Sequence, residues 1–296
     1  MVPLFTADAV YEAVSPERAL DAVREAFLAY ARGDWTMPPK VYVPAYPAGD
    51  FRAMPALGAG HALLKWVTSF PGNPALGLPT VAGVVLLSDA ANGALRAVLD
   101  AGAVTALRTG AAAVVGAGVN GRAAARTFLA RGRDVVLFDV ERARAETVAA
   151  ELGAGVADAL DEALAADVVV TVTPGHEVLL APGTLRSGQH VSLMGADGPG
   201  KAEIAVDELL RTRIFCDDWE QASHNGELVH AVEAGRLRHA DVTDLGAVLA
   251  GEAAGRTSDD EITSFDSTGL AIQDLAIALA ALERLDALDG VAYVEL

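Results

Sequence analysis

The feature that most constrains this chain is a glycine motif between a predicted strand and a predicted helix. Residues 114–122 read Val-Val-Gly-Ala-Gly-Val-Asn-Gly-Arg, so Gly116, Gly118 and Gly121 have the spacing G-x-G-x-x-G. In such a motif the first glycine permits a tight turn, the second lets the backbone approach a pyrophosphate, and the third lets helix and strand pack closely. The helix N-terminus favours negative charge. The motif therefore predicts a dinucleotide-binding turn.

A second apolar strand supports this interpretation. Residues 135–138 read Val-Val-Leu-Phe and are followed by Asp139, which lies 18 residues after Gly121. A dinucleotide site needs a carboxylate at about this place to bind the ribose hydroxyls. Because Asp139 would repel a 2′-phosphate, we expect NAD as the cofactor. Arg142 and Arg144 follow closely, so NADP stays an alternative.

Length and charge limit the classes of protein to which the chain can belong. A chain of 296 residues should form about two domains. Its net charge of −18 argues against nucleic acid and anionic membranes as partners, because both favour cationic surfaces. We expect no membrane span and no signal peptide, because no long apolar run is free of charges and the N-terminus lacks a basic region. The one cysteine, Cys216, fits a cytoplasmic protein, and the scattered histidines predict no metal site.

The first hundred residues are typical of an α+β arrangement. Ser15 and Pro16 are the capping and first residues of a predicted helix that ends at Gly33. Its predicted apolar face consists of Leu20, Val23, Ala26, Phe27 and Tyr30. Predicted strands cover residues 41–43, 51–56, 63–67, 81–87 and 94–99, and Asn92-Gly93 joins the last two as a hairpin.

From residue 112 the pattern changes to alternating strands and helices, which predicts a parallel sheet. The predicted strands are 112–115, 134–139, 167–173, 190–195 and 214–216, and the predicted helices are 122–130, 142–152, 157–165 and 203–211. An apolar helix follows at 270–285. We therefore expect an α/β protein in which a Rossmann-type doubly wound sheet (112–265) is inserted into a smaller α+β domain (1–111 plus 266–296) that binds substrate and dimerises.

Six sequence blocks occur in an order that resembles the ornithine cyclodeaminase/μ-crystallin family. They are residues 65–74 (KWVTSFPGNP), 78–80 (LPT), 105–111 (TALRTGA), 116–121 (GAGVNG), 195–201 (GADGPGK) and 265–269 (FDSTG). The resemblance implies a two-domain subunit, a homodimer formed through the first domain, and a nicotinamide cofactor on the second. It also implies an α-amino or α-imino acid between the domains and a hydride step at its α-carbon.

The resemblance also implies which residues bind the substrate. A small amino acid offers mainly its carboxylate for binding, so cationic side chains are needed, and arginine can bind a carboxylate with two hydrogen bonds. Arg52 and Arg108 are the candidates for this role, Thr80 is a further predicted substrate contact, and Lys40 is a weaker candidate because several relatives carry arginine there. Lys65 aligns with the lysine of the family that contacts the substrate carboxylate or carbonyl oxygen, although a lysine in an apolar strand ordinarily lies at a sheet edge.

Asp197 is the expected acid–base residue. It follows the predicted strand near residue 194, at the sheet edge where open α/β folds bind ligands. An aspartate in a glycine-rich turn is the ordinary alternative. In the family this residue manages protons around the imine, and we expect it to face Lys65 across the nicotinamide pocket. The predicted cofactor-binding residues are Gly116, Gly118, Val119, Asn120, Gly121, Asp139, Thr171, Thr173, Pro174, Ser267 and Gly269.

One departure from the family pattern concerns the link between the domains. The family has a connecting helix before the first Rossmann strand, but here only Gly110 and Ala111 separate Thr109 from that strand. Either the chain is shortened at this place or a segment is missing from the sequence. A shortening would move Arg108 relative to the substrate.

Three functions fit these observations. The first is an NAD-dependent oxidoreductase that interconverts a small L-amino acid with its oxo acid and ammonia, similar to alanine dehydrogenase. The second is an ornithine or lysine cyclodeaminase with catalytic NAD, or a ketimine reductase. The third is a nucleotide-binding protein without catalysis. The presence of both Lys65 and Asp197 favours an enzyme, and the missing helix favours the third reading.

Overall fold

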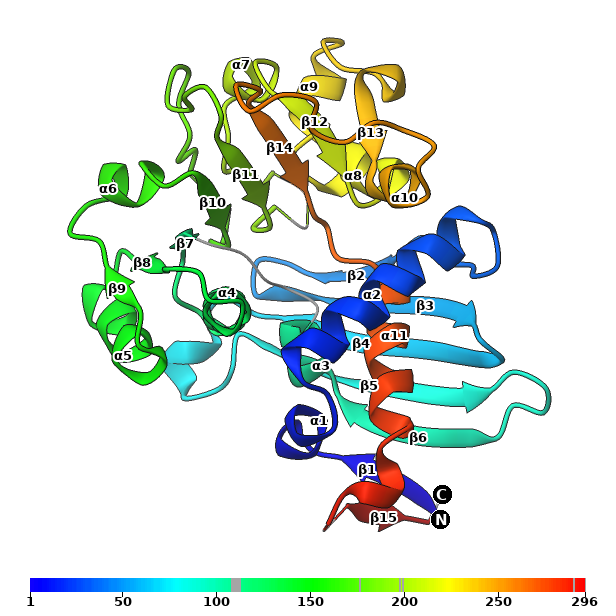
Figure 1. The fold of residues 1–296 in the computed structure, drawn as a ribbon. Helices are drawn as coiled ribbons and strands as arrows, with labels where there is room; N and C mark the ends of the chain where they lie inside the picture. Colours follow the sequence, from blue (N-terminus) through cyan, green and yellow to red (C-terminus); the bar gives the residue numbers. More distant parts are fainter. Residues whose placement is uncertain (108–112, 176, 197, 199, 290, 296) are drawn as a thin grey trace. The chain divides into compact units, whose positions relative to one another are not determined.

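The computed structural model describes residues 1–107, 113–175, 177–196, 198, 200–289 and 291–295. The chain divides into two compact units (Figure 1). Unit 1 consists of Met1–Arg108 and Leu270–Leu296, and unit 2 of Thr109–Gly269. Each unit has its own sheet, and unit 2 is inserted between two parts of unit 1.

Unit 1 contains a seven-stranded sheet in the order β15-β1-β6-β5-β4-β3-β2. The strands are β1 (Val2–Phe5), β2 (Val41–Ala45), β3 (Gly49–Gly58), β4 (His61–Ser69), β5 (Val81–Asp89), β6 (Leu95–Asp100) and β15 (Ala292–Val294). Among the described strands of this sheet, β1 and β6 pair in parallel and the other neighbours pair antiparallel. The predicted hairpin through Asn92-Gly93 is confirmed, and Gly93 has the positive φ of 76° that such a turn requires.

Two helices of unit 1, α2 and α11, pack side by side on one face of its sheet (Figure 1). The helices of this unit are α1 (Ala7–Ala13), α2 (Pro16–Ala31), α3 (Ala101–Leu107), α11 (Ala271–Leu282), η1 (Asn73–Leu76) and η3 (Leu285–Ala287). Helix α2 starts as predicted, because the Ser15 hydroxyl accepts a hydrogen bond from the Arg18 N–H at 3.2 Å. Its predicted face is wrong at Leu20, which is 41% exposed, because the smaller Ala19 and Ala22 take the buried positions.

Unit 2 contains an eight-stranded sheet in the order β9-β8-β7-β10-β11-β14-β12-β13. The strands are β7 (Ala113–Val115), β8 (Val136–Phe138), β9 (Gly155–Val156), β10 (Val168–Thr171), β11 (His190–Leu193), β12 (Arg213–Cys216), β13 (Val242–Asp244) and β14 (Thr263–Asp266). All neighbours pair in parallel. The order runs outward from β7 in both directions, which confirms the doubly wound α/β fold. The strand order reverses between the neighbouring strands β7 and β10, and in open α/β sheets such a reversal marks the edge where ligands bind.

The helices of unit 2 are shorter than predicted in two places. They are α4 (Val119–Ala130), α5 (Arg142–Leu152), α6 (Leu160–Leu164), α7 (Val206–Leu209), α8 (Trp219–Asn225), α9 (Val229–Glu233), α10 (Leu245–Leu249) and η2 (His239–Asp241). Helix α5 has its predicted bounds. Helix α7 starts late because the Glu203 carbonyl accepts hydrogen bonds from the N–H groups of Leu179 and Leu180, which holds this segment extended.

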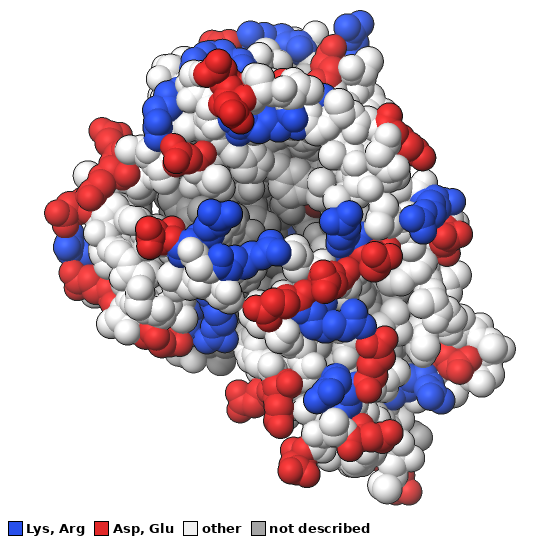
Figure 2. Space-filling model, viewed as in Figure 1, with Lys and Arg blue, Asp and Glu red and all other residues white. Residues whose placement is uncertain are grey.

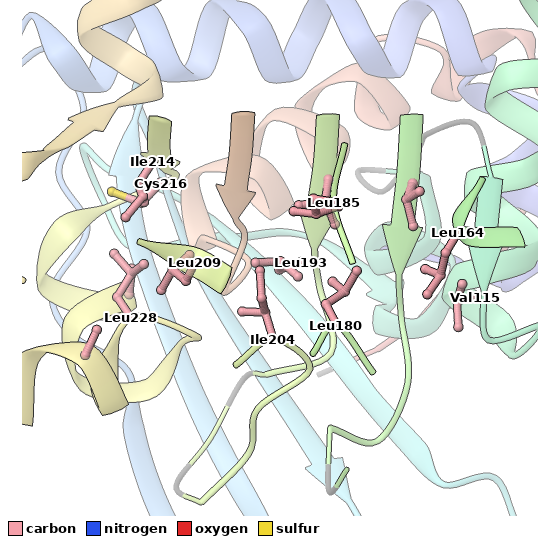
Figure 3. Packing of buried hydrophobic residues seen from close by; sticks show 14 of the residues in the cluster. Val115, Leu164, Leu180, Leu185, Leu193, Ile204, Leu209, Ile214, Cys216 and Leu228 are labelled. Carbon is pink, nitrogen blue, oxygen red and sulfur yellow. The ribbon is translucent and has the colours of Figure 1, made fainter. Parts of the chain in front are cut away.

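A continuous apolar core supports the unit 2 sheet. Figure 3 shows part of it, with Leu180, Leu193 and Ile204 grouped together. These side chains are less than 5% exposed. Burial on this scale stabilises the unit by roughly 2 kcal/mol for each such side chain. No helix among the described residues has the length and apolar character needed to cross a bilayer.

Candidate functional site

The glycine turn of unit 2 has the geometry that a dinucleotide requires. Gly116 has a φ of 108°, which disfavours any residue with a side chain. A β-carbon on Gly121 would overlap the Gly116 carbonyl, so glycine is needed for this close packing. A β-carbon on Gly118 would instead enter open space, at the N-cap of α4. The turn therefore leaves room for a phosphate at the α4 N-terminus, beside the exposed Val119 and the half-buried Asn120.

Asp139 lies directly after β8 and is held beside the glycine turn. Its Oδ2 accepts a hydrogen bond from the Ala117 N–H at 2.8 Å, and its Oδ1 accepts one from the Glu141 N–H at 2.9 Å. Arg144 Nη1 lies 3.2 and 3.3 Å from the two oxygens. Arg142 pairs instead with Glu146 and Asp158, each at 2.7 Å. Both arginines near Asp139 therefore already have carboxylate partners.

Thr171, the last residue of β10, and Thr173, on the segment that follows it, both contact one buried carboxylate. The hydroxyl groups of both threonines donate to Glu203 at 2.6 Å, and the Thr173 N–H donates to it at 2.9 Å. The Gly195 N–H, after β11, also donates to Glu203, at 2.8 Å. Pro174 follows Thr173 on the same segment. The sequence analysis missed Glu203 as a site residue, because it is the first residue of a helix predicted over residues 203–211.

A second buried carboxylate organises the segment after β14. Asp217 accepts the Gly269 N–H at 2.9 Å and lies 3.3 to 3.4 Å from the hydroxyl groups of Ser267 and Thr268. These contacts keep residues 267–269 with unit 2. Asp217 was also missed, although it directly follows the predicted strand 214–216, much as Asp139 directly follows β8. That position was the signal that could have identified it.

Further acidic side chains lie behind Glu203. Glu227 accepts hydrogen bonds from the N–H of Glu203 at 2.8 Å and 3.0 Å, and Asp266 accepts one from the Leu228 N–H at 3.3 Å. Burial, and next the Glu203 carboxylate, raise the pKa of Glu227 to about 8. Burial, with Asp217 and Glu227 nearby, raises the pKa of Asp266 well above its ordinary value. Below a pH of about 8 the neutral form of the Glu227 side chain is therefore favoured in the folded protein.

Lys65 is the buried cation of unit 1. Its side chain on β4 is 2% exposed, and its Nζ donates to Thr105 Oγ1 on α3 at 2.6 Å and to Asp274 Oδ1 on α11 at 3.0 Å. Asp274 is fully buried. The edge-residue alternative for Lys65 is therefore wrong. Asp274 was missed, and the signal for it was an acidic residue within an otherwise apolar helix.

Arg52 on β3 faces the same side of the sheet as Lys65. In the antiparallel register Met54 lies opposite Lys65, and Arg52 is two residues from Met54. Arg52 Nε and Nη2 lie 2.6 and 3.3 Å from the two oxygens of Asp50, and its guanidinium lies 5.4 Å from the Tyr42 ring centroid. These contacts hold the guanidinium in one orientation.

The other predicted substrate residues are less informative. Lys40 is half-buried just before β2, and the Thr80 carbonyl accepts a hydrogen bond from the Phe70 N–H at 2.8 Å. Arg108 and Asp197 lie outside the described residues, as does the short link before β7. Within the described part of the chain, no group of His, Cys, Asp and Glu side chains could hold a metal ion. Figure 2 shows acidic and basic side chains mixed over the visible face.

Comparisons with known proteins agree with this geometry. A model of the ornithine cyclodeaminase/mu-crystallin family matches residues 3–288. An alanine dehydrogenase of Archaeoglobus fulgidus is 41% identical over 304 aligned positions, covering 95% of this chain and 94% of that protein. Those positions outnumber the 296 residues of this chain, so the relative has residues that this chain lacks.

Solved structures give the same answer. An archaeal alanine dehydrogenase dimer with bound NAD has a TM-score of 0.91 and 37% identity, with 99% of each chain covered. The iminosuccinate reductase of Paracoccus denitrificans in complex with NAD+ has a TM-score of 0.87 and 28% identity, covering 100% of this chain and 99% of that one. The resemblance expected from six sequence blocks is thus confirmed over nearly the whole length, and the chain belongs to the ornithine cyclodeaminase/mu-crystallin family.

Proposed function

We propose that this protein is an NAD-dependent oxidoreductase that interconverts a small L-amino acid with its oxo acid and ammonia through an imine, as an alanine dehydrogenase does. The observation that carries the proposal is the 41% identity with an alanine dehydrogenase over 95% of the chain. The chain also has a buried lysine at position 65 and an aspartate at position 197, the two residues that the chemistry needs.

The residues of the glycine turn fit the cofactor. Gly116, Gly118 and Gly121 would hold the pyrophosphate, and Asp139 would accept hydrogen bonds from the ribose hydroxyls. The carboxylate of Asp139 favours NAD over NADP because it would repel a 2′-phosphate. When bound, NAD would supply the acceptor for the hydride that leaves the substrate α-carbon.

The residues of unit 1 fit the substrate. In this proposal Lys65 and Arg52, with Arg108, bind the substrate carboxylate and the carbonyl oxygen of the oxo acid. Buried cations are suited to this, because charge-assisted hydrogen bonds are strongest where water is excluded. Asp197 would take protons from the amino group and from the water that attacks the imine. A small apolar substrate needs no acceptor for a distal ammonium, unlike ornithine.

A coupled assay tests the proposal. Pyruvate and ammonia should consume NADH, followed by its absorbance. Ornithine that gives proline and ammonia with catalytic NAD, without net NADH change, would assign a cyclodeaminase instead. NADH binding without turnover of either substrate would contradict an enzymatic role.

Asp197→Ala should lower kcat by at least about a hundredfold and leave the NADH Kd nearly unchanged, because general acid–base catalysis contributes on that order. Asp207→Ala is the matched control, since Asp207 forms an exposed ion pair with Arg236 on the surface of unit 2. Unaltered turnover in Asp197→Ala would remove this residue from the mechanism.

We also propose a homodimer formed through unit 1. The sheet face opposite Lys65 carries exposed apolar side chains, among them Val41 at 55% and Trp66 at 37% exposure, and Trp66 stacks on Phe51 at 5.7 Å. An apolar patch of this kind marks an interaction surface. The archaeal alanine dehydrogenase is a dimer. A monomer mass in light scattering would contradict this assembly.

The lone cysteine fits a cytoplasmic location for the enzyme.

A further inference from the structure

The buried carboxylate of Glu203 joins two loop segments at the ligand-binding edge of unit 2. Glu203 is fully buried, and four donors approach its two oxygens. Oε1 accepts the Thr173 N–H and hydroxyl, and Oε2 accepts the Thr171 hydroxyl and the Gly195 N–H, all between 2.6 and 2.9 Å. A carboxylate has about four acceptor positions on its two oxygens, so the set is complete.

The backbone around Glu203 is fixed as firmly as its side chain. Its own N–H donates to Glu227, and its carbonyl accepts the N–H groups of Leu179 and Leu180. The Ala202 N–H donates to the Gly175 carbonyl at 2.7 Å. The chain that leaves β11 through Gly195 therefore returns to the same place at residues 202–203, where the Glu203 carboxylate accepts the Gly195 N–H.

Gly195 is shaped to receive this carboxylate. A β-carbon at position 195 would overlap the Glu203 carboxyl group and the Thr173 carbonyl, so only glycine lets the three groups meet. Glu208 offers a useful contrast within the same unit. It is also fully buried and accepts two backbone N–H groups, from Gly183 and Leu185 at 2.6 Å, but these lie away from the ends of β10 and β11.

We propose that Glu203 is a positioning residue for the reaction, which fixes the segment after β10 against the segment after β11. Thr173, a proposed cofactor contact, is on the first segment, and the proposed acid–base residue Asp197 comes two residues after Gly195. This inference rests on the proposed function for its catalytic consequence. The link between the two segments, called the Glu203 clamp below, follows from the hydrogen bonds of Glu203 alone.

The test is Glu203→Gln beside Glu208→Gln. A glutamine at position 203 turns one oxygen into an NH2 group, and either orientation then sets a donor against the fixed N–H of Thr173 or Gly195. Glu203→Gln should lower kcat at least about tenfold, while the substrate KM and the NADH Kd change much less. Glu208→Gln should lower the melting temperature to a similar extent and leave kcat at the wild-type value. Equal loss of kcat in both variants, or wild-type kcat in Glu203→Gln, would overturn the proposal.

Amide hydrogen exchange tests the clamp without any activity. The N–H groups of Thr173 and Gly195 should exchange at least about tenfold faster in Glu203→Gln, whereas in Glu208→Gln those of Gly183 and Leu185 should do so. Unchanged exchange at Thr173 and Gly195 would overturn the clamp even if the wild-type protein proved inactive on every substrate. If Glu203→Gln does not fold, Thr171→Val removes one donor from Oε2 with little change in shape, and it should lower kcat about threefold. Wild-type kcat and exchange in that variant would also overturn the proposal.

Discussion

Lys65 shows, at the scale of a single residue, how a buried charge depends on a distant counter-charge. An unpaired buried ammonium costs several kcal/mol, and Asp274 and Thr105 offset that cost through hydrogen bonds of 3.0 and 2.6 Å. The sequence predicted Lys65 from its block but not Asp274. The two residues are 209 positions apart, and no local spacing connects them. A pair of this kind becomes visible only when the sheet and α11 are assembled.

Lys65→Met should lower the free energy of unfolding by roughly 3–5 kcal/mol, because it leaves the Asp274 carboxylate buried without its ammonium partner. Lys65→Met combined with Asp274→Leu should recover most of that loss, since both polar groups are then replaced by apolar ones of similar size. Urea unfolding measures both effects. The proposed function predicts that neither variant turns over substrate. A double variant no more stable than Lys65→Met would contradict the structural importance of the pair.

Elements whose ends carry local chemical signals were predictable. Ser15-Pro16 gave the start of α2, and Asn92-Gly93 gave the β5–β6 turn. Strands β9 and β13 were not predicted, because they have two and three residues and exist through pairing with β8 and β12. The start of α7 was misplaced, because tertiary hydrogen bonds to Glu203 override the helical pattern.

The glycine turn and α4 allow a matched pair of variants. Gly118→Ala should leave the melting temperature nearly unchanged, because its β-carbon meets open space, but it should raise the NADH Kd at least about tenfold by blocking the pyrophosphate. Gly121→Ala should lower the free energy of unfolding by about 1–3 kcal/mol, because its β-carbon overlaps the Gly116 carbonyl. Thermal unfolding and NADH fluorescence titration separate the two. Wild-type stability in Gly121→Ala would contradict the close packing.

For the whole molecule, the change from α+β to alternating strands and helices predicted the fold class. The parallel sheet of unit 2 follows from that alternation. The sheet of unit 1 did not follow from it, because β1 pairs with β15 from the opposite end of the chain. The predicted site is only partly described, because Arg108 and Asp197 lie outside the described residues. The contacts of Glu203, Glu227 and Asp266 were invisible in the sequence, since each carboxylate accepts hydrogen bonds from another segment of the chain.

The pH dependence of stability should reveal Glu227. Its pKa is about 8 in the folded protein against an ordinary 4.5, so between these values the folded state holds a proton that the unfolded state has lost. The free energy of unfolding should therefore fall as pH rises from about 4.5 to about 8, by roughly 3–5 kcal/mol from this group. Glu227→Gln should flatten that slope in chemical unfolding measured across the range.

Glu208→Gln is the control for the pH series. Burial acts to raise the pKa of Glu208, but hydrogen bonds from Gly183, Leu185 and Arg211 outweigh it and lower the pKa. The contribution of Glu208 to the free energy of unfolding is therefore constant above its unfolded pKa. Glu208→Gln should shift the plot of that free energy against pH without changing its slope in this range. Equal slopes in wild type and Glu227→Gln would show that Glu227 is ionised in the folded protein.

The return of α11 to the first unit has a consequence for synthesis. All of unit 2 is translated between β6 and α11, and unit 2 is continuous in the chain, so it can fold as it leaves the ribosome. The apolar sheet face of the first unit stays uncovered until Leu270–Leu296, which includes α11, emerges. In nascent chains stalled before α11, unit 2 should therefore be resistant to protease. The first part of unit 1, Met1–Arg108, should instead bind chaperones.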